Sequence, residues 1–182
     1  MTTSFLERVR AAMETYFGPD ERRIDHARQV ATFAEDLLRF IDADESITMT
    51  AAYLHDIGIP EAERKYGSCG GSHQEQEGPP VARTLLRQIG ADETFVEAVC
   101  TLVGKHHTPS GVDSPEFRIL WDADALVNLA QILPGKPPER IRAILDKTMV
   151  TEPGYRQALG LFLGGGDRAE TPSVNPRNQK QL

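Results

Sequence analysis

The sequence predicts an all-helical protein. Apolar residues recur every three to four positions along almost the whole chain, and no stretch alternates apolar and polar residues over the length of a strand. The breaks between these periodic segments carry the glycine, proline and capping residues that end and begin helices. A chain of 182 residues suits one compact helical bundle, which we expect over residues 1–163, and we find no internal repeat.

The first third of the chain predicts three helices. One covers residues 5–17 and another residues 20–38, where Asp20 is a candidate N-cap. A third is expected to follow the candidate N-cap Ser46 and contains the segment ITMTAAYLHDI. Because the second half of that segment is almost entirely apolar, we expect it to be buried. Gly58 is expected to end this helix.

The segment YGSCGGS, residues 66–72, is typical of a flexible loop. It lacks the Gly-Lys-Ser/Thr sequence of a phosphate-binding P-loop, so we interpret it as a lid or hinge. Pro79 and Pro80 are expected to open the next helix, because proline suits the first helical turn. The same periodicity predicts further helices near residues 92–107, 114–129, 138–149 and 153–163.

Composition limits the partners and the location that we expect. The net charge is −7 with a pI near 5.2, which disfavours nucleic acid or an anionic membrane as the main partner. No apolar run approaches the roughly 18 residues of a membrane span, and the N-terminus lacks the apolar stretch of a signal peptide. The two cysteines form no CxxC pattern, so we expect a reducing, cytoplasmic environment.

The C-terminal segment, residues 164–182, is polar and rich in glycine, proline and asparagine. Such a composition is disordered in isolation, because it buries too little apolar surface to offset the entropy of ordering. The segment can become ordered by packing on its own domain or on a neighbouring subunit. We therefore leave a homodimer open.

Histidines and aspartates stand at the ends of several apolar helices. His26 lies one turn from an apolar face, His55 and Asp56 follow the most apolar helix, and residues 106–107 are a histidine pair. Asp124 shares a helix face with apolar residues. A lone histidine is more often structural, but a buried carboxylate costs several kcal/mol unless it is paired or binds a metal. The combination therefore favours a divalent metal site with nitrogen and oxygen ligands.

These residues resemble a known signature. His26, the adjacent His55 and Asp56, and then Asp124 are similar to the H…HD…D pattern of the HD-domain superfamily of metal-dependent phosphohydrolases. The segments AAYLHDIG and DADALVNL resemble the local context of that pattern. The resemblance implies a helical bundle of the HD type in which the four residues hold one metal ion. Asp122 is the second choice for the last ligand.

The resemblance covers about residues 20–130 and extends to a second metal. Members of the superfamily with the pattern H…HD…H…H…D bind two metal ions, and the aspartate of the HD pair bridges them. By that resemblance, Asp56 is the bridge, and His73 with His106 or His107 supplies the second site. One site is expected and a second is possible, with Mn, Fe, Ni, Co, Mg or Zn as the candidate metals.

The resemblance implies hydrolysis of a phosphoester in a nucleotide or another small phosphorylated metabolite, with metal-bound water as the nucleophile. Asp56 is expected to orient the attacking water, and Glu77 is a candidate for the same role. Lys105, next to the histidine pair, is a candidate to meet the phosphate charge. Further candidate cations are Arg22, Arg23, Arg64 and Lys65.

Two other functions stay open. Some members of the superfamily with the longer histidine pattern are di-iron oxygenases that act on small polar substrates. A non-catalytic module that binds a metal or a nucleotide is the third possibility. A cyclic-dinucleotide phosphodiesterase of the Gly-Tyr-Pro type is disfavoured, because TPSGVDSPEF follows the histidine pair and contains no Gly-Tyr-Pro.

Overall fold

The computed structural model describes residues 4–108 and 112–164, and every regular element in them is an α-helix. The all-helical class predicted from the periodicity is confirmed. The predicted polar tail lies, beyond Gly164, outside the described residues. In chain order the helices are α1 (Phe5–Phe17), α2 (Glu21–Leu38), α3 (Glu45–Leu54), α4 (Ile59–Tyr66), α5 (Gly71–Gln88), α6 (Glu93–Val103), α7 (Pro115–Ile132), α8 (Pro138–Thr148) and α9 (Glu152–Leu163).

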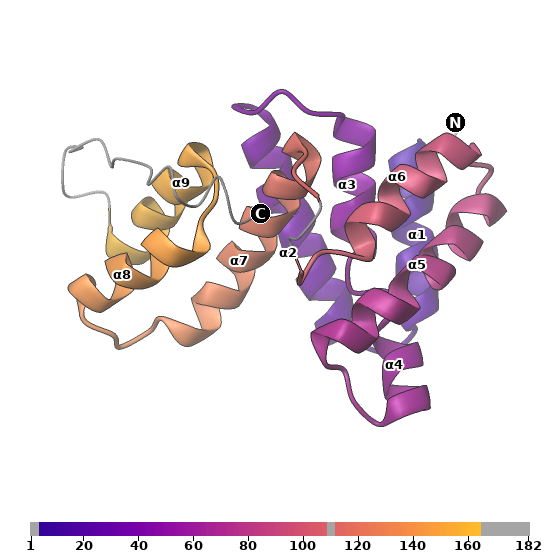
Figure 1. Ribbon diagram of the computed structural model, residues 1–182, viewed down its shortest axis with the longest axis horizontal. Helices are drawn as coiled ribbons and strands as arrows, with labels where there is room; N and C mark the ends of the chain where they lie inside the picture. Colours follow the sequence, from indigo (N-terminus) through magenta and orange to yellow (C-terminus); the bar gives the residue numbers. More distant parts are fainter. Residues whose placement is uncertain (1–3, 109–111, 165–182) are drawn as a thin grey trace.

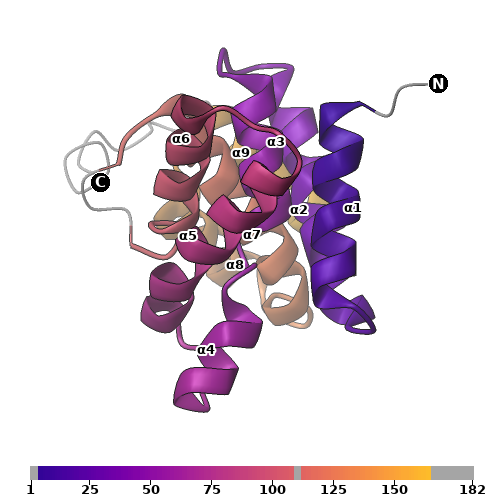
Figure 2. The same cartoon turned by 90° about the vertical axis from the view of Figure 1, so that its right-hand side faces the viewer.

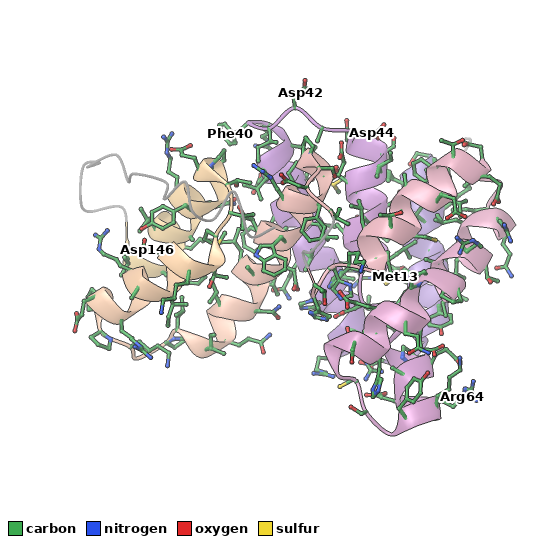
Figure 3. The ribbon with its side chains drawn as sticks, viewed as in Figure 1. Met13, Phe40, Asp42, Asp44, Arg64 and Asp146 are labelled. Carbon is green, nitrogen blue, oxygen red and sulfur yellow. The ribbon has the colours of Figure 1, made fainter. Side chains whose placement is uncertain are left out.

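Short polar side chains cap most of these helices. Each cap accepts a hydrogen bond from a backbone amide of the first turn, which satisfies one donor that has no partner inside the helix. The prediction that Ser46 caps the third helix is wrong. Asp44 is the cap, with an extended backbone and a carboxylate that accepts from the amide of Ile47 at 2.9 Å (Figure 3). The capping side chains are Ser4, Asp20, Asp44, Asp92, Ser114 and Thr151.

The segment after α3 differs most from the prediction. α4 is a helix that the sequence pattern did not indicate, with Pro60 in its first turn. The expected start of a helix at Pro79 is also wrong. α5 begins at Gly71, within the expected loop, and both Pro79 and Pro80 lie in its interior. The loop between α4 and α5 is therefore only residues 67–70.

Close packing accounts for a helix that continues through two prolines. A Cβ atom placed on Gly58 would lie 2.5 Å from the backbone nitrogen of Gly78 and 2.6 Å from the carbonyl oxygen of Gln74. The turn after α3 therefore touches the backbone of α5 directly, and a glycine is required at the contact. This tertiary contact holds the first two turns of α5 in place despite the missing amide donors of the prolines.

The helices that carry the candidate ligands meet at the centre of the molecule. α2 packs against α3 and α7, and α3 also contacts α1, α6 and α7 (Figure 1). α5 packs against α6 and α4, and α4 lies at the lower edge in Figure 2. The end of α3 is therefore surrounded by α2, α7 and α6, and this arrangement brings distant parts of the sequence to one site.

The buried apolar residues form two clusters. The larger one joins α1, α2, α3, α5, α6 and α7, and the smaller one joins the second half of α7 to α8 and α9. In Figure 1 the pair α8 and α9 lies at one end of the molecule, and α7 connects it to the other helices. None of the helices in the described part of the chain is long and apolar enough to cross a membrane.

Candidate metal centre

The first group of candidate ligands comes from three helices. His26 lies on α2, His55 directly follows α3, and Asp124 lies on α7. His26 Nε2 is 3.2 Å from His55 Nε2 and 3.1 Å from Asp124 Oδ1. One ligand atom from each residue lies within 4.8 Å of the other two. The packing of α2 on α3 and α7 thus gathers two imidazoles and a carboxylate at one point.

Asp56 lies beside this first group and also faces a second one. Its Oδ2 is 3.4 Å from His55 Nε2 and 3.6 Å from His26 Nε2. Its Oδ1 is 3.5 Å from His106 Nε2. The second group consists of Asp56, His106 and His107, again with ligand atoms within 4.8 Å of one another. The two oxygens of one carboxylate therefore face two sets of imidazoles.

The ring orientations of the two buried histidines are set by the backbone. His55 Nδ1 donates to the carbonyl of Ala52 at 2.8 Å, and His106 Nδ1 donates to the carbonyl of Val103 at 2.7 Å. Because a carbonyl only accepts, each Nδ1 carries a proton, and in the neutral ring each Nε2 presents its lone pair. Such a bond to the second ring nitrogen is the usual support of a metal-ligating histidine.

The donor atoms fit a divalent metal ion. His106 Nε2 is buried and has no hydrogen-bond partner in the described structure, although a buried polar atom normally has one. It faces an oxygen of Asp56, and imidazole nitrogens with carboxylate oxygens are the ligands that Mn, Fe, Co, Ni and Zn accept. The arrangement therefore leaves one ligand atom, His106 Nε2, unpaired within the described residues where a cation would satisfy it.

The electrostatics of the group also favour a cation. Burial raises the pKa of the Asp56 and Asp124 carboxyls, but the neighbouring histidines more than reverse this effect and hold both below the ordinary value. Burial lowers the pKa of His55, but Asp56 and then Asp124 raise it to about 9. Without a metal, protonated His55 thus offsets part of the negative charge of the two carboxylates, and a divalent ion can take the place of its proton.

Asn128 supports the first group from outside. It lies one turn after Asp124 on α7 and donates through Nδ2 to Asp124 Oδ1 at 2.9 Å. This hydrogen bond holds the carboxylate in one orientation, as the hydrogen-bond partners of metal ligands generally do.

Comparison with known proteins identifies the family of this chain. The family model of the HD domain matches residues 23–129, which is more than half of the chain. The chain belongs to the HD domain family. The matched segment contains every residue of both ligand groups.

One solved structure is similar to this HD domain. It is the crystal structure of a protein described as a predicted HD superfamily hydrolase from an uncultured Thermotogales bacterium. The two chains are 30% identical, with a TM-score of 0.57, and the match covers 84% of this chain and 80% of the other. A search of curated proteins found no match.

The HD domain uses Asp122 and Asp124 differently. Asp122 is fully buried, and its carboxylate accepts from the amides of Val150 and Thr151, each at 2.9 Å, and from Thr151 Oγ1 at 2.6 Å. It thus ties α7 to the start of α9. Asp124 points to the other side of α7, into the first ligand group. The structure therefore places the preferred ligand in the group and the second choice outside it.

The structure does not bring His73 or Glu77 into either group of the described residues. The His73 ring stacks on Tyr66, with ring centroids 4.2 Å apart and planes 20° apart. Glu77 accepts hydrogen bonds from the Lys65 ammonium and the Tyr66 hydroxyl, and these bonds lower its pKa. A carboxylate with a lowered pKa and two donors is a weak base, so Glu77 is poorly suited to take a proton from water.

Most of the candidate cations have partners within the protein. Arg23 pairs with Asp20 and Glu63, and Lys65 pairs with Glu77. Arg64 pairs with Glu61 at 2.6 Å and projects from α4 at the lower edge of Figure 3. Arg22 and Lys105 are exposed, and the described part of the chain shows no ion pair for either. Of the five candidate cations, these two are therefore the ones without an ion pair in the described residues.

Sequence reasoning missed Gln74 and Glu75 in the first turn of α5. Gln74 Oε1 is 3.1 Å from His107 Nε2, and Glu75 accepts from the backbone amide of His107 at 3.1 Å. Both residues lie between the expected loop, residues 66–72, and the expected helix start at Pro79, so no helical face was assigned to them. The run of polar residues after the glycines, HQEQE, was the only available signal.

Proposed function

We propose that this HD domain is a metal-dependent phosphohydrolase that cleaves a phosphoester of a nucleotide or another small phosphorylated metabolite. The observation that carries the proposal is Asp56, which presents one oxygen to the His26, His55 and Asp124 group and the other to His106. The similar structure described as a predicted HD superfamily hydrolase supports the reaction class.

The residues divide into two parts. His26, His55, Asp124 and one oxygen of Asp56 would hold one divalent ion, and the other oxygen would hold a second ion with the histidine pair at residues 106–107. A divalent ion bound there supplies positive charge that offsets the charge of the phosphoryl oxygens and makes nearby water more acidic.

The protein itself orients the reactants. Asp56 stays ionised next to the histidines, so it can accept a hydrogen bond from the attacking water and align it with phosphorus. Asn128 keeps Asp124 turned into the group. Lys105, exposed and next to His106 in the chain, is the side chain that we assign to a phosphate oxygen of the substrate.

The test is a panel of phosphoesters with defined metal contents. The protein is purified without chelator, its metals are measured, and it is then assayed with Mn, Fe, Ni, Co, Mg or Zn on nucleotides, dinucleotides and aryl phosphates. We expect hydrolysis that the double variant His55→Ala/Asp56→Ala loses, whereas Lys105→Met raises KM more than it lowers kcat. Absence of hydrolysis for every substrate and metal would contradict the proposal.

A di-iron oxygenase is the second candidate, because a carboxylate that faces two ligand groups also suits a pair of iron ions. Two irons per chain, a mixed-valent EPR signal and oxygen consumption with a small polar substrate would favour it. Hydrolysis supported by Mn or Mg would count against it. Binding of nucleotides without turnover under any condition would instead indicate a non-catalytic module.

A further inference from the structure

Gln74 uses both ends of its side-chain amide. It is 8% exposed, its Nε2 donates to the carbonyl of Cys69 at 2.6 Å, and its Oε1 is 3.1 Å from His107 Nε2. Because a carbonyl only accepts, the bond to Cys69 decides which end of the amide is the nitrogen. The amide oxygen therefore faces His107. A hydrogen bond at that position requires the proton of the ring to be on His107 Nε2.

The rest of the first turn of α5 fixes the ring of His107. A Cβ atom placed on Gly71 would lie 2.9 Å from His107 Cδ2 and 3.0 Å from Cγ, so this edge of the ring rests on the helix backbone. Glu75 accepts from the amide of His107 and, at 2.9 Å, from the hydroxyl of Thr108. One helical turn thus holds the ring with Nε2 occupied, and Nδ1 forms no hydrogen bond within the described residues.

We propose that Gln74 is a positioning residue for the second half of the metal centre. It fixes His107 as the tautomer protonated on Nε2, so that Nδ1 is the nitrogen that His107 contributes beside Asp56 and His106. His55 and His106 are arranged in the opposite sense, with Nδ1 bonded to a carbonyl and Nε2 facing the ligands. The inference rests on the metal centre of the proposed function and does not depend on which reaction occurs there.

The unpartnered nitrogen of His106 indicates where the second metal ion would bind. His106 Nε2 is buried without a hydrogen-bond partner in the described residues and lies 3.5 Å from Asp56 Oδ1. His107 completes a group with these two residues, and its ring centroid is 4.0 Å from that of His106. Because Gln74 already occupies Nε2 of His107, the lone pair available to this group is the one on Nδ1.

The first test is the tautomer of His107 in the metal-free protein. A long-range ¹H–¹⁵N correlation spectrum separates the two neutral tautomers by the chemical shifts of the ring nitrogens. We expect the Nε2-protonated form in the wild type and in Gln88→Met, the matched control at the exposed end of the same helix. Gln74→Met should populate the other tautomer, and Gln74→Glu should restore the first. A wild-type His107 protonated on Nδ1, or a spectrum that Gln74→Met leaves unchanged, would overturn the proposal.

The second test is a titration of the metal-free protein with Mn²⁺ by calorimetry and EPR. In Gln74→Met we expect the first ion to bind as in the wild type and the second to bind about 10–100-fold more weakly, as is usual when the support of a ligand is lost. Equal affinity for the second ion in Gln74→Met, or a wild type that binds only one ion, would refute the role in metal binding. A protein that passes both tests but hydrolyses no phosphoester would contradict the proposed function alone.

Discussion

Replacing Asp122 and Asp124 separately tests the assignment of the metal centre. The two aspartates stand two positions apart on α7 and point to different sides of the helix. Asp124 belongs to the first ligand group, whereas Asp122 accepts hydrogen bonds from the chain that leads into α9. We predict that Asp122→Ala lowers stability and keeps the metal, and that Asp124→Ala loses the metal.

The size of the stability loss follows from the contacts of Asp122. Its removal leaves three partly buried donors without an acceptor, namely the Val150 amide, the Thr151 amide and the Thr151 hydroxyl. Each unsatisfied donor costs about 1–3 kcal/mol, so the gross loss is at least about 3 kcal/mol. Burial raises the pKa of Asp122 to about 6 despite these bonds, which shows that the ionised group is itself expensive to bury.

Because the substitution also removes a buried charge, part of this cost is recovered. We therefore expect the free energy of unfolding of Asp122→Ala to fall by about 3 kcal/mol, the lower end of the range for three donors. For a domain of this size the corresponding decrease in Tm is about 6–12 °C. The assay is thermal unfolding of chelator-treated protein, in which loss of metal cannot contribute, together with metal analysis of untreated protein. An unchanged Tm in Asp122→Ala, or metal lost from Asp122→Ala and retained in Asp124→Ala, would refute the reasoning.

Three further predictions concern the same region. Because the pKa of His55 is raised to about 9, a metal ion must displace its proton at neutral pH. Metal affinity, measured by calorimetry, should therefore rise about tenfold per pH unit from pH 7 to 9. The free energy of unfolding of the metal-free protein should fall over the same range. An affinity that does not change with pH would contradict this prediction. Asn128→Ala should weaken metal binding about 10–100-fold, because Asp124 loses the hydrogen bond that orients it, and chelator competition measures the change. Gly58→Ala should cost about 1–3 kcal/mol in urea unfolding, because the added methyl overlaps the backbone of α5; a neutral effect would show that this contact is loose.

Much of the fold could be predicted because helix formation depends on local sequence patterns. The helices that pack on the core each begin at a capping residue, such as Asp20 or Ser114, and continue with periodic apolar residues. Prediction of a helix from these patterns fails where tertiary contacts oppose the local preference of the residues. Pro79 and Pro80 predict the start of a helix, yet they lie inside α5, because Gly58 and Gly78 bring the backbones together before them.

The candidate site divides in the same way. The residue types favoured a metal site, because imidazoles and carboxylates on apolar helices need a reason to be buried. The resemblance to the HD-domain signature assigned that site to His26, His55, Asp56 and Asp124. No sequence pattern predicted the contacts that the residues around the site make. Whether His73 reaches the site or stacks on Tyr66 depends on where α5 begins, and this start is set by packing rather than by the sequence nearby.

The sequence by itself therefore determined the helical class, which depends on local spacing. It indicated the candidate metal ligands through their side-chain chemistry and their resemblance to the HD-domain signature. Only the tertiary structure decided how those residues combine. It separated Asp124 from Asp122, gave the two oxygens of Asp56 to different groups, and placed Gln74 against His107. The physical reason is that the direction of a side chain is fixed by the helices packed around it, and residues far apart in the chain supply those helices.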